Sequence, residues 1–179
     1  MQEDLIDAIA ALRPRVLSIV SKGVWHCTHH DRYADILLSG AILPEPSIDD
    51  ADRWKTGAGP KHYPFARHLG GVSLFQFEPF EPDTYERDYP LSDWRTFVPC
   101  IKAWSATIWI EVDTSHLADF IPGPQLIQRW RDEKAYGHTI MPVIEAAHIG
   151  ALPVTAFARA LVVSPADQSI RELTAGATR

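Results

Sequence analysis

After residue 23, short strand-like runs outnumber long helical patterns, and this feature most limits the folds open to the chain. Alternation of apolar and other residues every two positions is typical of a β-strand, because successive side chains point to opposite faces. Further strands are predicted over residues 24–28, 72–77, 140–147 and 159–164. The sequence therefore predicts an α+β domain with one sheet system. The clearest run is Trp104–Val112, where Trp104, Ala106, Ile108 and Ile110 alternate with Ser105, Thr107, Trp109 and Glu111.

Three helices are predicted around these strands. The first covers residues 5–20, where apolar residues recur three and four positions apart, and it is expected to break or restart at Pro14. A short helix covers residues 31–40, and a third covers residues 124–135. The sheet is thus expected to follow a helical lead.

The whole chain, residues 1–179, is expected to form one domain, because a single core typically serves roughly 100–200 residues. Residues 1–22 form the helical lead, and residues 165–179 are expected to be a frayed tail. Residues 44–70 and 78–100 contain many Pro and polar residues without a clear period, which predicts two long irregular insertions. Loops of this length in a compact domain are usually functional or mobile.

Composition removes several classes of protein. The formal net charge of −6 argues against a protein that coats nucleic acid through bulk charge. Two cysteines, Cys27 and Cys100, are too few for a disulfide scaffold or an all-cysteine zinc site. No apolar run approaches the ~20 residues that cross a membrane, and the N-terminus lacks the basic start of a signal peptide. We therefore expect a cytoplasmic protein without a membrane partner.

A first candidate site lies where the strand predicted over residues 24–28 runs into the next helix. In an extended strand His26 and Thr28 point to the same face, and Cys27 points to the other. An imidazole offers one donor and one acceptor, so His26 beside a hydroxyl can hold two adjacent hydroxyls of a sugar. A structural histidine with satisfied hydrogen bonds is the alternative interpretation.

The next strand adds a second candidate. Gly70 and Gly71 precede it, and paired glycines let a ligand or another backbone approach closely. Ser73 on that strand can face the same cleft as His26. The alternative is an ordinary hairpin entry with an exposed serine.

Glu145 is an acid inside an otherwise apolar run, Val143-Ile144-Glu145-Ala146-Ala147. A carboxylate is rarely buried without a partner or a chemical task. Perturbed acids cluster at functional sites, so we prefer a functional role for Glu145 over a structural salt bridge.

Together, His26-Cys27-Thr28, Ser73 and Glu145 resemble the three strand motifs of the ADP-ribosyltransferase superfamily. The segment VWHCTHHDRYADILLSGAILP is similar to the opening of the DNA-modifying toxins and tRNA 2′-phosphotransferase relatives in that superfamily. The segment VIEAAHIGALPVTAFARALVV is similar to its glutamate strand, proline turn and final strand. The resemblance covers residues 24–43 and 140–163, and residues 70–77 more weakly. It implies an ADP-ribosyltransferase-like split β-sheet core.

The resemblance also implies a chemistry, with NAD as the substrate lying across a cleft between two half-sheets. His26 would bind the adenosine ribose, supported by Thr28, and Ser73 would contribute to the same cofactor site. Glu145 would hold the 2′-hydroxyl of the nicotinamide ribose and stabilise the oxocarbenium that forms as nicotinamide leaves. His26 and Glu145 are thus the residues expected to carry the reaction.

Residues of the first irregular insertion are expected to complete the NAD site. Tyr63 or Phe65 would stack on the nicotinamide, and Arg53 or Arg67 would pair with the pyrophosphate, which a guanidinium matches bidentately. Arginine-specific members carry Gln or Glu where this chain has Val143. The acceptor of ADP-ribose therefore stays open: a protein, a nucleic acid, a small molecule or water.

A metal-dependent hydrolase is an alternative from another chemistry. It would use the cluster of His26, His29, His30, Glu145 and His148. Zinc or iron takes three such ligands and leaves a position open. In a strand, however, Glu145 and His148 point to opposite faces, so the preferred interpretation assigns no metal to the site.

A catalytically inactive protein of the same fold, with a binding or interaction role, is the other alternative. Replacement of Glu145 by Gln separates the two classes, because it should abolish nicotinamide release in an enzyme and leave partner binding intact.

Overall fold

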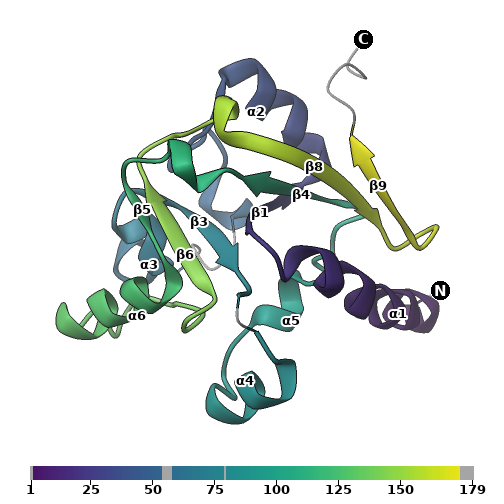
Figure 1. Cartoon of the computed structure of the whole chain (residues 1–179), viewed down its shortest axis with the longest axis horizontal. Helices are drawn as coiled ribbons and strands as arrows, with labels where there is room; N and C mark the ends of the chain where they lie inside the picture. The colour runs from purple at the N-terminus through teal and green to yellow at the C-terminus, as the bar shows by residue number, and fades with distance from the viewer. Residues whose placement is uncertain (1, 54–57, 79, 174–179) are drawn as a thin grey trace.

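The computed structural model describes residues 2–53, 58–78 and 80–173. Within these residues the chain forms a seven-stranded antiparallel sheet in the order β5-β6-β3-β1-β4-β8-β9 (Figure 1). Helices around a mostly antiparallel sheet make this an α+β fold, which confirms the predicted class. The strands of the large sheet are β1 (Val24–His29), β3 (Gly71–Gln76), β4 (Thr107–Val112), β5 (Phe120–Ile121), β6 (Glu145–Ile149), β8 (Phe157–Ser164) and β9 (Ser169–Leu173). A two-stranded sheet pairs β2 (Ala41–Ile42) with β7 (Leu152–Pro153).

The helices are mostly short. Those of the two expected insertions have four to seven residues, which is about two turns at most and too little to show a period in the sequence. The α-helices are α1 (Gln2–Val20), α2 (Tyr33–Ser39), α3 (Phe65–His68), α4 (Pro82–Asp88), α5 (Trp94–Phe97) and α6 (Gly123–Asp132). Turns of 3-10 helix cover His30–Arg32, Asp50–Asp52, Pro60–His62, Thr114–His116 and Val154–Ala156.

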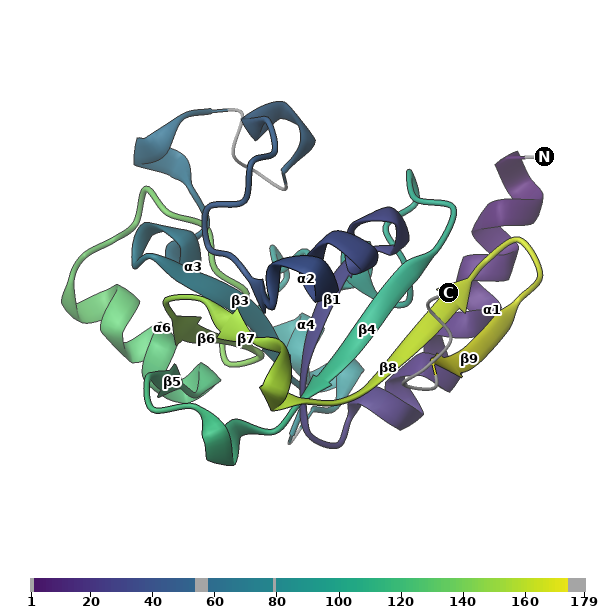
Figure 2. The same ribbon diagram turned by 90° about the horizontal axis from the view of Figure 1, so that it is seen from above.

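The large sheet opens between β1 and β3. These strands pair at Val24 with Gln76 and at Trp25 with Phe75. Beyond Trp25, β1 continues to pair with β4 as far as His29, whereas β3 pairs with β6. In Figure 2, β3 and β6 lie on one side and β4 and β8 on the other, and the two groups spread apart with α2 between them. The sheet therefore has two parts that are joined at one end.

Helices cover both faces of the sheet, so several strands are buried on both sides. Helix α1 packs one face with Leu12 and Val16 against Trp25 and Trp109. On the other face, α2 packs against a second apolar cluster that includes Ile110. A third cluster joins α3 and α6 to the edge formed by β5 and β6. Burial on both faces explains why Trp109 and Ile110, adjacent in β4, are both fully buried.

Helix α1 runs through Pro14 without the predicted restart. Leu12 and Val16 on either side of the proline are buried in the same cluster, with 0% and 1% of their surface exposed. Burial of one such side chain contributes roughly 1.5–3 kcal/mol, which is similar to the ~3 kcal/mol that a proline costs inside a helix. Packing of the apolar face therefore offsets the lost hydrogen bond.

Three predicted segments differ in the structure. The strand predicted over residues 104–112 begins only at Thr107, because the N–H of Trp104 donates to the carbonyl of Ile101 over 2.8 Å and closes a turn. The strand predicted over residues 140–147 begins at Glu145, because the preceding residues form a turn in which Val143 is left-handed, with φ 66°. The tail expected to be frayed instead contains β9. This strand pairs with β8 along its whole length, from Ser169 opposite Ser164 to Leu173 opposite Ala160. Residues 174–179 of that tail lie outside the described residues.

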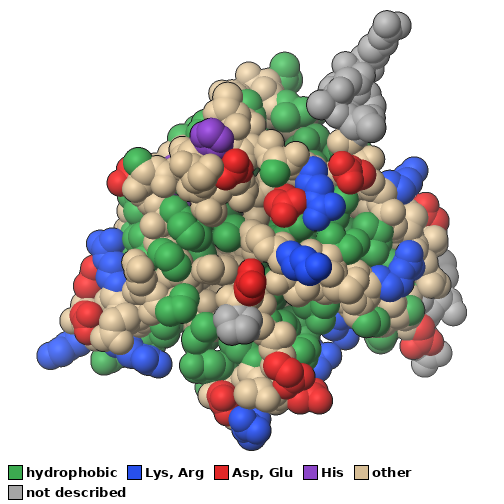
Figure 3. Space-filling model, viewed as in Figure 1, with side chains coloured by type: hydrophobic (Ala, Val, Ile, Leu, Met, Phe, Trp, Pro, Cys, Tyr) green, Lys and Arg blue, Asp and Glu red, His purple; other side chains and the backbone are tan. Residues whose placement is uncertain are grey.

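No helix in the described part of the chain is both long and apolar enough to cross a membrane. On the face shown in Figure 3, Lys and Arg side chains are scattered among Asp and Glu.

Candidate functional site

A cavity of about 670 Å³ lies at the opening between β1 and β3. Small-molecule sites typically measure roughly 300–1,000 Å³, so this volume suits a ligand of that class. The residues of β1 that line it are His26, Cys27 and Thr28, and those of β3 include Ser73. Glu145 at the start of β6 closes one wall. The structure thus brings His26, Thr28, Ser73 and Glu145 to one cavity.

Glu145 is held in a defined orientation, with 3% of its surface exposed. The hydroxyl of Ser73 donates to Oε1 over 2.7 Å, and the backbone N–H of Met141 donates to Oε2 over 2.8 Å. Ser73 pairs with Ala147, and Phe75 pairs with Glu145, so Ser73 and Glu145 are diagonal neighbours on one face of the sheet. The carboxylate therefore has a donor on each oxygen and lone pairs left for a ligand.

The turn before β6 fixes this carboxylate. Val143 has φ 66°, a conformation that costs a β-branched residue roughly 1–3 kcal/mol. The N–H of Glu145 donates to the carbonyl of Met141 over 3.0 Å, which closes the turn. Gly123 at the start of α6 packs against it, and a Cβ at that position would lie 1.6 Å from the carbonyl oxygen of Val143. Helix α6 therefore requires glycine here to support the turn.

His26 is half-buried, and its ring reaches across the opening of the sheet. Nδ1 lies 3.0 Å from the carbonyl oxygen of Ser73. A carbonyl only accepts, so Nδ1 carries the proton and Nε2 is an acceptor in the neutral ring. Burial lowers the pKa of His26, against the opposing effect of the Ser73 carbonyl, which favours this neutral form. His26 was expected to offer a ribose both a donor and an acceptor. Because its N–H already donates to the carbonyl of Ser73, only the acceptor Nε2 is available to a ligand.

Ser73 links the two residues that the sequence singled out. Its carbonyl accepts from His26 on β1, and its hydroxyl donates to Glu145 on β6. One residue of β3 thereby sets the positions of side chains on both neighbouring strands. The sequence predicted that Ser73 faces the cleft, and the structure adds that it positions Glu145.

Burial raises the pKa of Glu145 to about 6, and the hydrogen bonds from Met141 and Ser73 hold it below the value that burial alone would give. At neutral pH the carboxylate is mostly ionised, although it lies in a poorly solvated wall. Such a charge interacts strongly with a positive charge placed beside it.

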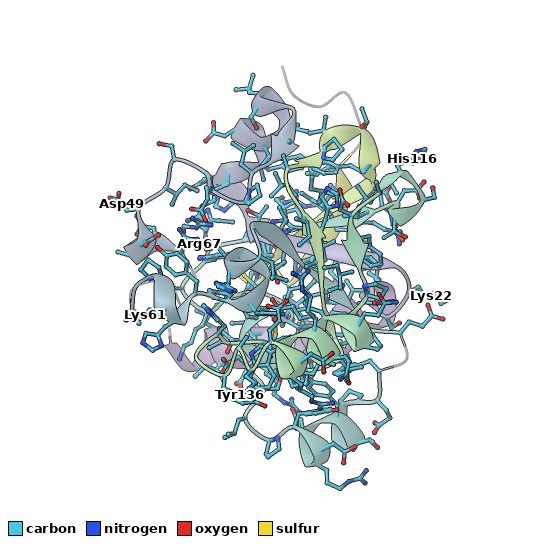
Figure 4. All side chains as sticks on the ribbon, turned by 90° about the vertical axis from the view of Figure 1, so that its left-hand side faces the viewer. Lys22, Asp49, Lys61, Arg67, His116 and Tyr136 are labelled. Carbon is cyan, nitrogen blue, oxygen red and sulfur yellow. The ribbon has the colours of Figure 1, made fainter. Side chains whose placement is uncertain are left out.

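The arginines expected at the pyrophosphate also line the cavity, and both are held by acids. Arg67 donates to both oxygens of Glu45 over 2.7 Å and to Asp50 over 2.9 Å. Arg53 shares Glu45, with Nη1 2.8 Å from Oε2. In Figure 4, Arg67 lies inward of Asp49 and Lys61. Glu45 thus occupies, on Arg67, the bidentate position that a phosphate would take.

The two aromatic residues proposed to stack on nicotinamide do not line the cavity. Phe65 is fully buried beside α6, so its ring is not available to a ligand in this structure. Tyr63 lies against Arg67, whose guanidinium is 3.6 Å from the ring centroid, and its hydroxyl donates to Asp50 over 2.6 Å. The aromatic side chains that do line the cavity are Phe75, Phe97, Trp104 and Trp130.

The ligand set of the alternative metal hydrolase is not assembled. Within the described residues, the group of three or more ligand atoms close enough to share an ion is His29, His30 and Asp31. His148 pairs with Val72, and its Nε2 lies 3.3 Å from the carbonyl oxygen of Ala151. As predicted for a strand, it lies on the face opposite Glu145, because β6 begins at Glu145.

Some contributors gave little sign in the sequence. Met141 acts through its backbone N–H, which any non-proline residue provides. Glu45 stands between Pro44 and Pro46, and only the path of the folded loop brings it to Arg67. The close approach of α6 to the backbone of Val143 had one sign in the sequence, the glycine at position 123 in the first turn of that helix.

Comparison of the chain with protein-family models, curated proteins and solved structures finds no match. The geometry itself defines a small-molecule cavity in an opened sheet. A buried carboxylate, an imidazole acceptor and two acid-paired arginines are placed around it.

Proposed function

We propose that this protein is an NAD-dependent ADP-ribosyltransferase or NAD glycohydrolase with an ADP-ribosyltransferase-like core. The observation that supports it best is Glu145, a buried carboxylate held by Ser73 and Met141 at the wall of the cavity that His26 also lines. NAD would enter this cavity as the substrate.

The proposed reaction breaks the bond between nicotinamide and its ribose. The bonding electrons leave with nicotinamide, which removes the positive charge of its ring, and the ribose becomes an oxocarbenium. The ionised carboxylate of Glu145 stabilises that charge and accepts a hydrogen bond from the ribose 2′-hydroxyl. The acceptor then forms a bond to the ribose carbon and releases a proton, so the products are nicotinamide, the ADP-ribosyl adduct and H⁺.

Other groups in the cavity would position the substrate. Nε2 of His26 would accept from a hydroxyl of the adenosine ribose, with Thr28 beside it on β1. Arg53 and Arg67 would face the pyrophosphate, once the ligand takes the place of Glu45 on Arg67. The stacking partner of nicotinamide would come from the aromatic residues that line the cavity, in place of Tyr63 and Phe65.

The experiment that tests this function is incubation of the purified chain with NAD, followed by chromatographic detection of free nicotinamide and ADP-ribose. Glu172→Gln serves as a control, because Glu172 is an exposed acid on β9 outside the cavity. Release of nicotinamide by wild type and Glu172→Gln supports the proposal. Binding of NAD without release would favour the catalytically inactive alternative, and absence of both would reject the proposal.

A further inference from the structure

His29, His30 and Asp31 gather three potential metal ligands where β1 ends and the following 3-10 turn begins. One ligand atom of each lies within 4.8 Å of the others. Nε2 of His30 is 2.7 Å from Oδ1 of Asp31, and Nδ1 of His29 is 3.6 Å from Oδ2 of the same carboxylate. Asp31 thus lies against both imidazoles, and its backbone N–H donates to Nδ1 of His29 over 3.2 Å, a bond that an ion at this nitrogen would replace.

The spacing is close to that of a transition-metal site. Ligand atoms that bind a tetrahedral zinc at about 2.1 Å lie about 3.4 Å from one another. The two imidazoles contact different oxygens of Asp31, at 3.6 Å from His29 and 2.7 Å from His30, so one ion would take both oxygens or require a small rotation of the carboxylate. Two imidazoles and one carboxylate form a donor set that suits zinc, nickel or copper.

Two further features single out this cluster. Nε2 of His30 faces Asp31 and is the nitrogen available to an ion there, whereas Nδ1 points to a buried position and has no hydrogen-bond partner among the described residues. The ring of His29 meets Trp104 edge-on, with centroids 5.2 Å apart, and its backbone pairs with Thr107 on β4. The strand and the indole therefore hold one ligand in place before an ion arrives.

We propose that His29, His30 and Asp31 form a binding site for a divalent transition-metal ion, with water in the remaining positions. The site is distinct from the NAD chemistry, since neither His26 nor Glu145 belongs to it. Thr28 and Arg32, the residues on either side of the cluster in the sequence, both line the cavity, as does Trp104. A bound ion therefore fixes the edge of the cavity where β1 leads into α2.

The test is equilibrium dialysis of tag-free wild type against Zn²⁺, with His30→Ala, Asp31→Asn and His116→Ala measured in parallel. His116 is a matched control because it is exposed and pairs with Asp113 at 3.4 Å, outside the three-residue group. We expect one ion per chain, at least tenfold weaker binding in His30→Ala and Asp31→Asn, and unchanged binding in His116→Ala. Absence of stoichiometric zinc, or equal affinity in wild type and His30→Ala, would overturn the proposal.

Tryptophan fluorescence during titration with Cu²⁺ gives a second readout that locates the ion. Because Trp104 contacts the ring of His29, copper at this site should quench its emission. The quenching should be lost in Trp104→Phe, while dialysis still shows one bound ion. Quenching that persists in both Trp104→Phe and His30→Ala would place the ion elsewhere. Zinc binding should also persist in Glu145→Gln, which separates failure of this site from failure of the NAD proposal.

Discussion

The hydroxyl of Ser73 lies 2.7 Å from Oε1 of Glu145 and donates a hydrogen bond to it. Ser73 belongs to β3 and Glu145 to β6, so the bond crosses the sheet at the wall of the cavity. The carbonyl of the same serine accepts from His26. Both residues proposed to act on NAD therefore depend on Ser73 for their placement.

Ser73→Ala should raise the pKa of Glu145 above its value of about 6, because the hydroxyl stabilises the ionised carboxylate. Hydrogen bonds to charged groups contribute roughly 1.5–3 kcal/mol, so we expect the pKa to rise by about 1–2 units. The measurement is the pH profile of nicotinamide release, whose acidic limb should move to higher pH. Ser73→Thr keeps a hydroxyl and should restore the profile, whereas an unchanged profile in Ser73→Ala would contradict the positioning role.

Glu145→Gln should make the protein more stable at neutral pH than wild type. The folded-state pKa of Glu145, about 6, is above the ordinary 4.5 of the unfolded chain, so the folded state binds more protons between these values. Stability from this group is therefore present below pH ~4.5 and is lost as pH rises through 6. The difference between these two pKa values corresponds to about 2 kcal/mol of stability. Wild type loses this stability at neutral pH, and the Gln variant keeps it.

Urea denaturation of both proteins at pH 4.5 and 7.5 measures this effect. The difference in free energy of unfolding, Gln variant minus wild type, should increase with pH. A difference that is constant across this range would show that burial does not perturb Glu145.

Glu45→Gln should strengthen binding of ADP-ribose several-fold. The carboxylate of Glu45 occupies Arg67 bidentately and contacts Arg53, and these guanidiniums hold the pKa of Glu45 at about 2. A neutral amide competes less well with a pyrophosphate for the same donors. Calorimetric titration with ADP-ribose measures the change, with Asp49→Asn as a nearby exposed control. Unchanged or weaker binding would show that the arginines do not contact the pyrophosphate.

Gly123→Ala should displace the turn that carries Glu145. The added methyl group would lie 1.6 Å from the carbonyl oxygen of Val143, so α6 or the turn has to move. Overpacking of this kind costs typically 1–3 kcal/mol, and we expect at least a tenfold loss of nicotinamide release. Thermal denaturation and the activity assay report the two effects. Gln125→Ala, an exposed change on the same helix, should alter neither.

Local patterns predicted most of the sheet, because two-residue alternation depends on neighbouring residues alone. The segment Val24–His29 is a strand close to its predicted bounds, and Thr107–Val112 forms the last six residues of the strand predicted over 104–112. The strand predicted over 140–147 starts late because Val143 adopts a left-handed conformation that its β-branched side chain disfavours. Tertiary packing imposes that conformation, so no local pattern announces it.

Part of the candidate site could likewise be predicted from local sequence, and part could not. An acid in an apolar run, Glu145, was recognisable because its burial conflicts with its charge. The pairing of Arg67 with Glu45, 22 residues away in the sequence, could not be recognised, because it depends on the path of the loop. The location of Phe65 was missed for the same reason, since its neighbours in the sequence are polar or small while α6 covers it in space.

The rate of nicotinamide release from saturating NAD, compared between wild type and Glu145→Gln, tests the central proposal most directly. Loss of a preorganised charge next to a developing cation typically costs 10²–10³-fold in rate. We predict a decrease of at least ~100-fold in Glu145→Gln, while the affinity for ADP-ribose changes by no more than a few-fold. Equal rates in the two proteins, or no release by wild type, would contradict the account.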